Sequence, residues 1–134
     1  GKFGGATADD RLRAREWLFW GWDRFDAPVY RLRAWKLGFR QFDPAVIDLY
    51  AAERKAAFET LEQFFAAGHD FLAGDHATIA DIDLYGVAAL AYQGDYDVSV
   101  HPQLVKWMKR IEALPHFKSP ETLLPHESRS ASSS

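Results

Sequence analysis

The chain has 134 residues, of which 48% are hydrophobic and 15% aromatic, a composition that favours one folded domain over disorder. It contains no cysteine, which excludes disulfide bonds, thiolate catalysis and cysteine metal sites. The net charge is −3, but nine Lys/Arg and five Asp/Glu within residues 1–40 make that first third basic and the remainder acidic. No apolar run approaches the roughly 20 residues of a membrane-spanning helix, so we expect a cytoplasmic protein without a membrane segment.

The first third of the sequence predicts one long helix with an irregularity near its centre. Residues 1–6 are glycine-rich and typical of a linker remnant, and the lack of an initial Met suggests a processed chain or a piece of a longer one. Thr7 and Asp10 have the spacing of a capping box, which predicts a helix from residue 7 to about residue 25. Pro28 is expected to kink or interrupt this helix, because proline has no backbone N–H. The helical pattern then resumes and ends near Gly38.

A second long helix is predicted from Asp43 to Gly68. Asp43 is a suitable N-cap, and Pro44 suits the first turn because its fixed φ matches the helix. Apolar residues recur at three-to-four spacing up to Phe65, as expected of an amphipathic helix. Four charged side chains of this segment are expected to face outward: Glu53, Arg54, Glu59 and Glu62.

The segment from Phe71 to Ile82 carries the strongest local signal of the sequence. Thr78 and Asp81 have capping-box spacing ahead of an apolar run that extends to about Tyr92. Such an apolar helix must be buried on most sides, so the polar groups at its start need partners. Loss of the Asp81 carboxylate should therefore cost roughly 1 kcal/mol or more of stability.

The last predicted helix begins at Pro102 and ends before Pro115. Residues 118–134 are rich in Pro and Ser and are expected to form a flexible tail. With no strand pattern, the chain is predicted to be all-α, with a domain of about five or six helices over residues 7–117.

The segment Trp17–Phe25 places large apolar side chains in nearly every direction around its helix. Such a helix must bury two faces, one against the core of its own domain and one against something else. A partner domain, a second subunit or a ligand would each provide the second contact. An extended core that takes up several of these rings is the alternative.

Two strings of this sequence resemble one known family. The first is Phe71-Leu72-Ala73-Gly74-Asp75 followed by Thr78-Ile79-Ala80-Asp81-Ile82, and the second is His101-Pro102-Gln103-Leu104 followed by Trp107, Arg110, Pro115 and Phe117. In this order and at this distance, they resemble the helical C-terminal domain of bacterial-type cytosolic glutathione S-transferases. The resemblance implies a helical bundle in which Thr78 and Asp81 are structural capping residues.

The resemblance also implies what the chain lacks. In this family a thioredoxin-like N-terminal domain binds glutathione, the co-substrate, and usually activates its thiol. Nothing in this sequence resembles that domain, so we expect no catalytic residue and no glutathione binding by this chain alone. In the family, the helical domain forms the pocket wall for a hydrophobic electrophile and part of the homodimer interface, and the resemblance implies both roles here.

The resemblance assigns four candidate substrate-binding residues: Trp20, Arg24, Phe25 and Tyr30. Trp20 and Phe25 would form apolar wall, and Arg24 could pair with an anionic ligand or a partner carboxylate. For each residue the alternative is structural, with the aromatic rings in the core and Arg24 as a surface or interface charge.

Other kinds of site have little support in the sequence. No pair of the five histidines has the i, i+4 spacing of a helical zinc site, so no metal site is expected. Asp and Glu residues interrupt the basic first third, and the pI of about 5.9 argues against nucleic-acid binding. Two functions thus remain: the helical half of a glutathione S-transferase-like protein, or a non-enzymatic protein–protein interaction module of the same fold. The two matched strings argue against an unrelated helical ligand-binding domain.

Overall fold

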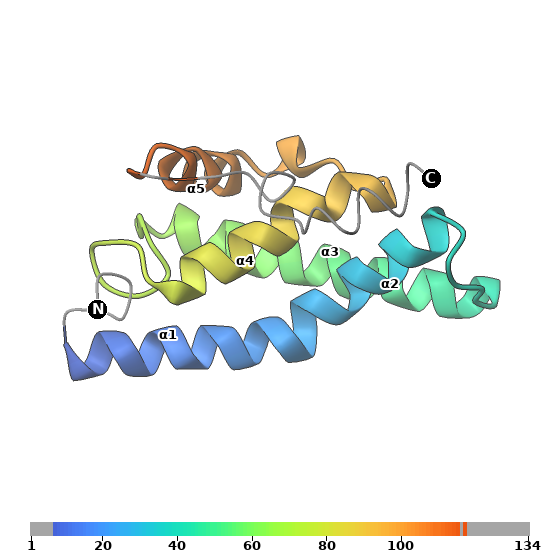
Figure 1. Ribbon diagram of the computed structural model, residues 1–134, viewed down its shortest axis with the longest axis horizontal. Coiled ribbons are helices and arrows are strands. Elements are labelled where there is room, and N and C mark those ends of the chain that lie inside the picture. Colours follow the sequence, from blue (N-terminus) through green and yellow to red (C-terminus); the bar gives the residue numbers. More distant parts are fainter. Residues whose placement is uncertain (1–6, 116, 118–134) are drawn as a thin grey trace, which may run out of the picture.

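The computed structural model describes residues 7–115 and 117, and Figure 1 shows these as packed helices joined by short loops. The elements are α1 (Ala8–Trp20), the π-helix η1 (Gly21–Asp26), α2 (Ala27–Lys36), α3 (Pro44–Ala66), α4 (Ile79–Leu90), the 3₁₀-helices η2 (Ala91–Gly94) and η3 (Val98–Val100), and α5 (Pro102–Glu112). The described part of the chain contains no strand, which confirms the all-α prediction. The predicted linker, residues 1–6, and the predicted tail, residues 118–134, lie outside the described residues.

The first predicted helix keeps its helical path beyond Pro28 by changing register. Thr7 caps α1, where its hydroxyl oxygen accepts a 3.0 Å hydrogen bond from the backbone N–H of Asp10. The chain then widens into η1, and α2 follows with Pro28 in its first turn. Proline needs no N–H there, because the preceding π-turns have already shifted the hydrogen-bond register. Figure 1 shows that α2 leaves in a different direction from α1.

Gly21 allows η1 to pass close over α4. A Cβ atom at this position would lie 3.0 Å from the Cδ1 atom of Leu84, which is itself fully buried. Most real Cβ contacts are longer, so a side chain at this position would require the Leu84 side chain to shift.

The ends of α2 and α3 follow the predicted signals. Gly38 has a φ of +84° after α2, and Phe39 N–H bonds the Ala34 carbonyl 2.8 Å away, as in a Schellman motif. Gly68 has a φ of +108° after α3. Asp43 occupies the N-cap position of α3, although its side chain accepts no capping hydrogen bond.

Arg54 does not face outward as expected. Its residue exposure is only 9%, its Nη1 donates a 2.8 Å hydrogen bond to the Gly94 carbonyl, and its Cζ lies 4.8 Å from the centre of the Tyr96 ring. The guanidinium thus satisfies a carbonyl of η2 and stacks on an aromatic face, while burial lowers its pKa. The outward prediction was wrong because the partners of Arg54 are about 40 residues away along the chain.

Glu62, which was also expected to face outward, instead contacts the start of α5. It is half-buried, and its carboxylate accepts hydrogen bonds from the backbone N–H groups of Gln103, at 3.2 Å, and Leu104, at 2.8 Å. These groups belong to the first turn of α5, whose N–H groups have no partner within the helix. A side chain of α3 therefore caps α5.

The core lies between α3, α4, α5 and η1, and its centre consists of large side chains that are less than 2% exposed. They include Phe25, Phe58, Leu61, Leu84, Leu104, Trp107 and Ile111. Rings from distant segments meet there: Phe25 lies edge-on to Phe58 with centroids 5.0 Å apart, and Phe65 stacks on Trp107 at 5.0 Å. The core therefore joins η1, α3 and α5 directly.

We expect Gly74→Ala to destabilise the domain more than Gly38→Ala does. Both glycines have a positive φ, +78° and +84°, so each alanine pays about 1 kcal/mol for the left-handed backbone. At Gly74 a Cβ would also lie 2.7 Å from Oδ2 of the buried Asp10, whereas at Gly38 it would meet nothing within 4 Å. Urea unfolding should give a loss of about 2 kcal/mol or more at Gly74. Equal losses in the two variants would show that α1 does not pack tightly on the loop before α4.

Candidate functional site

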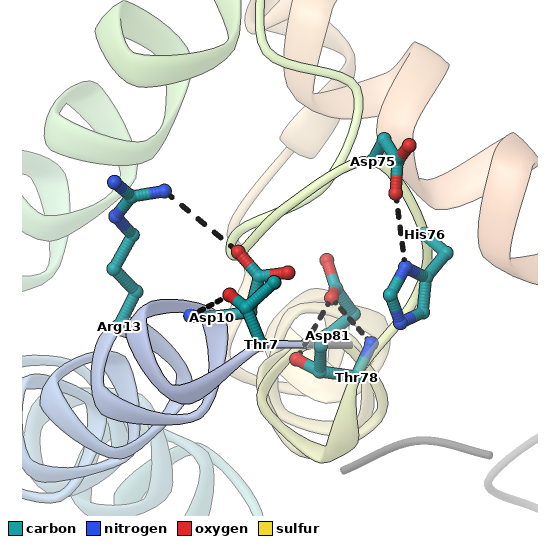
Figure 2. A network of polar contacts seen from close by, with 7 residues as sticks. All are labelled: Thr7, Asp10, Arg13, Asp75, His76, Thr78 and Asp81. Atoms are coloured by element: carbon teal, nitrogen blue, oxygen red, sulfur yellow. Dashed lines mark hydrogen bonds and ion pairs between the residues drawn. The ribbon is translucent and has the colours of Figure 1, made fainter. Parts of the chain in front are cut away.

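The Asp81 carboxylate forms a buried junction between three segments of the chain. Thr78 and Asp81 form the predicted capping box at the start of α4, and both residues are 0% exposed. Oδ2 accepts from the backbone N–H of Thr78 at 2.9 Å and from its hydroxyl at 3.2 Å, as Figure 2 shows. Oδ1 accepts from the backbone N–H of Leu72 at 2.9 Å and from Nε1 of Trp107 at 2.8 Å.

Sequence reasoning found the capping role of Asp81 but missed half of its contacts. The bonds from Leu72 and Trp107 tie the loop before α4 and the centre of α5 to one carboxylate. Burial raises the pKa of the Asp81 carboxyl, while the hydrogen bonds from Thr78, Trp107 and Leu72 oppose that rise. With four donors and no exposure to solvent, this carboxylate joins three segments of the fold.

The neighbouring polar contacts are local. Figure 2 shows Arg13 paired with Asp10 on α1, and His76 beside Asp75 on the loop before α4. The hydrogen bond from His76 lowers the pKa of Asp75. Over the described residues, no group of three or more His, Asp or Glu side chains is placed to hold a metal ion.

A groove between η1 and α3 brings together two of the four candidate substrate-binding residues. We call it the Trp20 groove; it encloses about 610 Å³ and is lined by Trp20, Asp23, Arg24, Glu53, Ala56, Ala57 and Thr60. Trp20 and the two alanines provide its apolar surface. Arg24 pairs with Asp23 at 3.0 Å, but both side chains are more than 70% exposed, so this pair holds the guanidinium only weakly.

The other two candidates lie elsewhere. Phe25 is 0% exposed and stacks beneath Trp20 with ring centroids 5.8 Å apart, so it supports the groove without lining it. Tyr30 is not among the lining residues of the Trp20 groove and instead lies near the carboxylates of Asp26 and Asp83. Two of the four candidate residues thus line one groove, and their role as a substrate wall stays a prediction.

The cluster of Asp26, Asp83 and Tyr30 was not anticipated from the sequence. Burial and the nearby charge of Asp83 raise the pKa of Asp26 to about 6. Burial and the two carboxylates also raise the pKa of Tyr30. Oδ1 of Asp26 is buried and has no hydrogen-bond partner within residues 7–115 and 117. The register change in η1 is what turns Asp26 toward α4, and a sequence pattern based on α-helical spacing cannot show this.

The aromatic segment is buried on one side and uncovered on another. Trp17 packs edge-on against Phe64 at 4.9 Å, and Phe25 reaches the core. Phe19 and Trp22 contact each other at 5.8 Å but remain 59% and 62% exposed. One expected face is therefore filled by this chain, and a second apolar face is left open.

Comparison with known proteins agrees with this architecture. Residues 40–115 match the family model of the glutathione S-transferase C-terminal domain, which is more than half of the chain. The chain belongs to this family. A comparison with curated proteins found no match.

Solved structures of glutathione S-transferases superpose well on this domain. A glutathione S-transferase from Xanthobacter autotrophicus Py2 is 28% identical, with a TM-score of 0.79 over 93% of this chain and 60% of its own. A possible glutathione S-transferase from Rhodopseudomonas palustris is 27% identical, with a TM-score of 0.81 over 92% of this chain and 56% of its own.

A third structure, the transferase Ure2p5 from Phanerochaete chrysosporium, was cocrystallised with 1-(S-glutathionyl)-2,4-dinitrobenzene. It is 22% identical, with a TM-score of 0.74 over 98% of this chain and 62% of its own. The chain therefore spans about 60% of the length of these structures. Among the described residues, this glutathione S-transferase domain has no helix that could cross a membrane.

We expect Asp81→Asn to destabilise the domain by about 3 kcal/mol, because an amide cannot accept all four hydrogen bonds and turns a donor toward donors. Asp48→Asn, at an exposed position of α3, is the matched control and should change stability little. Urea unfolding of both variants measures the difference. If both unfolded at the same urea concentration as the parent, the carboxylate would not hold these segments together.

Asp26→Asn should stabilise the domain at high pH. The folded state binds this proton more tightly than the unfolded state, whose pKa is near 3.8, so the contribution is complete below pH 4 and is lost as pH rises through about 6. Above pH 7 the variant should gain about 1 kcal/mol, a value reduced for solvent screening at a half-exposed group. Unfolding at pH 4 and pH 8 tests this, and an equal effect at both pH values would contradict it.

Proposed function

We propose that this chain is the helical half of a two-domain glutathione S-transferase-like protein that adds glutathione to an apolar electrophile. In this proposal a thioredoxin-like N-terminal domain binds glutathione and activates its thiol. The helical domain supplies the wall against which the electrophile lies. This chain alone is then inactive.

The uncovered aromatic face of α1 and η1 carries the proposal. Phe19 and Trp22 form an exposed pair on α1 and η1, whose opposite side packs on α3 through Trp17 and Phe25, and monomers rarely leave large apolar surface without a partner. A docked domain would cover the pair. The length of the chain, about 60% of the matched transferases, leaves room for such a domain in the parent.

The Trp20 groove supplies the chemistry that an electrophile wall needs. Trp20, Ala56 and Ala57 give an apolar surface, and the guanidinium of Arg24 stands at its edge, only weakly held by Asp23. Arg24 suits an anionic leaving group or a carboxylate of a second copy in a homodimer. Phe25 keeps Trp20 in place from beneath.

The exposed Phe19–Trp22 pair also favours the second candidate, a non-enzymatic interaction module of the same fold. In that case the pair would dock a separate protein, and the Trp20 groove would have no electrophile to bind. The coding sequence upstream of Gly1 separates the two functions, since only the enzyme requires a thioredoxin-like domain there.

In the full-length parent, Trp20→Ala should raise the KM for 1-chloro-2,4-dinitrobenzene about tenfold and leave the KM for glutathione unchanged. Removing the indole takes away apolar contact that the electrophile alone uses. Phe39→Ala, at a residue that is 75% exposed and outside the groove, is the matched control. Initial rates at varied concentrations of each substrate give both constants. An unchanged KM for the electrophile, or turnover by the 134-residue chain alone, would refute the proposal.

A further inference from the structure

The loop that joins α2 to α3 lies at one end of the longest axis of the molecule, as Figure 1 shows. We call this region the α2–α3 tip and define it as residues 37–42 together with Arg31 of α2 and with Leu49 and Tyr50 of α3. None of these residues lines the Trp20 groove, so the tip is separate from the proposed electrophile wall.

The tip is basic although the chain as a whole is acidic. Residues 27–42 contain four Lys/Arg and no Asp/Glu, whereas the net charge of the chain is −3. Lys36 and Arg33 are engaged by side chains in and after η2. Arg31 and Arg40 are exposed, and among the described residues neither forms a hydrogen bond or an ion pair. These two positive charges are therefore available to a partner.

Arg31 and Arg40 are each held against an aromatic ring. The rings of Phe42 and Tyr50 lie edge-on to each other with centroids 5.3 Å apart. Cζ of Arg31 lies 5.0 Å from the centre of the Tyr50 ring, and Cζ of Arg40 lies 5.1 Å from the centre of the Phe42 ring. A cation–π contact positions a guanidinium without neutralising its charge. The tip thus presents two ordered cations, each on its own ring.

The acidic residues nearest to the tip do not cancel these charges. Asp43 is the N-cap residue of α3, where the positive end of the helix dipole offsets its charge. Asp48 precedes Tyr50 by two residues, which places it about 200° away around α3. Glu53 lies about one turn further along α3 and lines the Trp20 groove. None of the three carboxylates forms an ion pair with an arginine of the tip.

Apolar side chains are exposed beside the two cations. Phe39 is 75% exposed, and Leu37 and Leu49 are exposed as well. The backbone beneath Phe39 is fixed, because the N–H groups of Phe39 and Arg40 both bond the Ala34 carbonyl, at 2.8 Å and 3.3 Å. An ordered loop that holds an aromatic ring in water forgoes the free energy that burial of the ring would give. The exposed ring therefore points to a partner that buries it.

We propose that the α2–α3 tip binds the surface of a membrane that contains anionic lipids. Arg31 and Arg40 attract the anionic headgroups, and Phe39 enters the boundary between the headgroups and the acyl chains. A protein partner would need a pocket for Phe39 and acidic groups placed opposite both arginines, whereas a bilayer offers apolar and anionic contacts over its whole surface. Attachment of this kind requires no membrane-spanning helix and does not depend on the proposed transferase function.

Co-sedimentation of the 134-residue chain with lipid vesicles tests the proposal. At low ionic strength the chain should bind vesicles of phosphatidylcholine with about 30% phosphatidylserine about tenfold more tightly than vesicles of phosphatidylcholine alone. Binding should weaken at about 0.5 M salt, because salt screens exposed charges. Equal binding to both vesicles, or binding to neither, would overturn the proposal. Tighter binding to soluble poly-glutamate than to the anionic vesicles would also overturn it, since the partner would then be an acidic protein.

Variants of the tip show whether it makes the contact. Arg31→Gln and Arg40→Gln should each weaken vesicle binding about fivefold, whereas Arg15→Gln, which removes the same charge from an exposed position of α1, should change it little. Phe39→Ala should weaken binding about tenfold, and Phe19→Ala, at the exposed pair on α1, should not. All five side chains are exposed, so each variant should unfold at the urea concentration of the parent. Equal losses in Arg15→Gln and Arg40→Gln, or in Phe19→Ala and Phe39→Ala, would refute the tip as the membrane contact.

Discussion

The fold depends on one ionisable group without access to water. The Asp81 carboxylate receives four hydrogen bonds, and their donors come from the start of α4, the preceding loop and α5. A buried carboxylate is tolerated only when its lone pairs are satisfied, so the position of each donor segment is constrained by the others. The start of α4, the loop before it and the centre of α5 are therefore fixed relative to one another.

The sequence predicted the elements better than the contacts between them. The helix boundaries were predicted from the capping pair Thr78 and Asp81, from Pro44 and from Gly38. Each of these acts on residues three to five positions away, so its effect is visible in the local sequence. Arg54 and Glu62 were misjudged because a charged residue on an amphipathic helix normally meets solvent. Their partners, Gly94 and the first turn of α5, come close only after folding.

Of the four candidate substrate-binding residues, two line one groove and two lie elsewhere. Trp20, the last residue of α1, and Arg24, within the π-helix, line the same groove. Phe25 and Tyr30 follow in or after the π-helix, where α-helical spacing no longer tells which side a residue faces. The family resemblance indicated which segment of the chain to consider, but the register of the π-helix determines which side of that segment each residue faces.

The length of the π-helix also fixes the direction of the Phe19–Trp22 pair relative to that of the Asp26–Asp83 cluster. A π-turn holds more residues per turn than an α-turn, so η1 acts as a spacer that sets the rotation of α1 relative to α2. Deleting a single residue from Gly21–Asp26 would allow a regular α-helix and rotate one side of the junction by about 100° against the other. The Phe19–Trp22 pair and the Asp26–Asp83 cluster could then not both keep their present directions. In evolution this segment should therefore tolerate substitution more readily than a change of length.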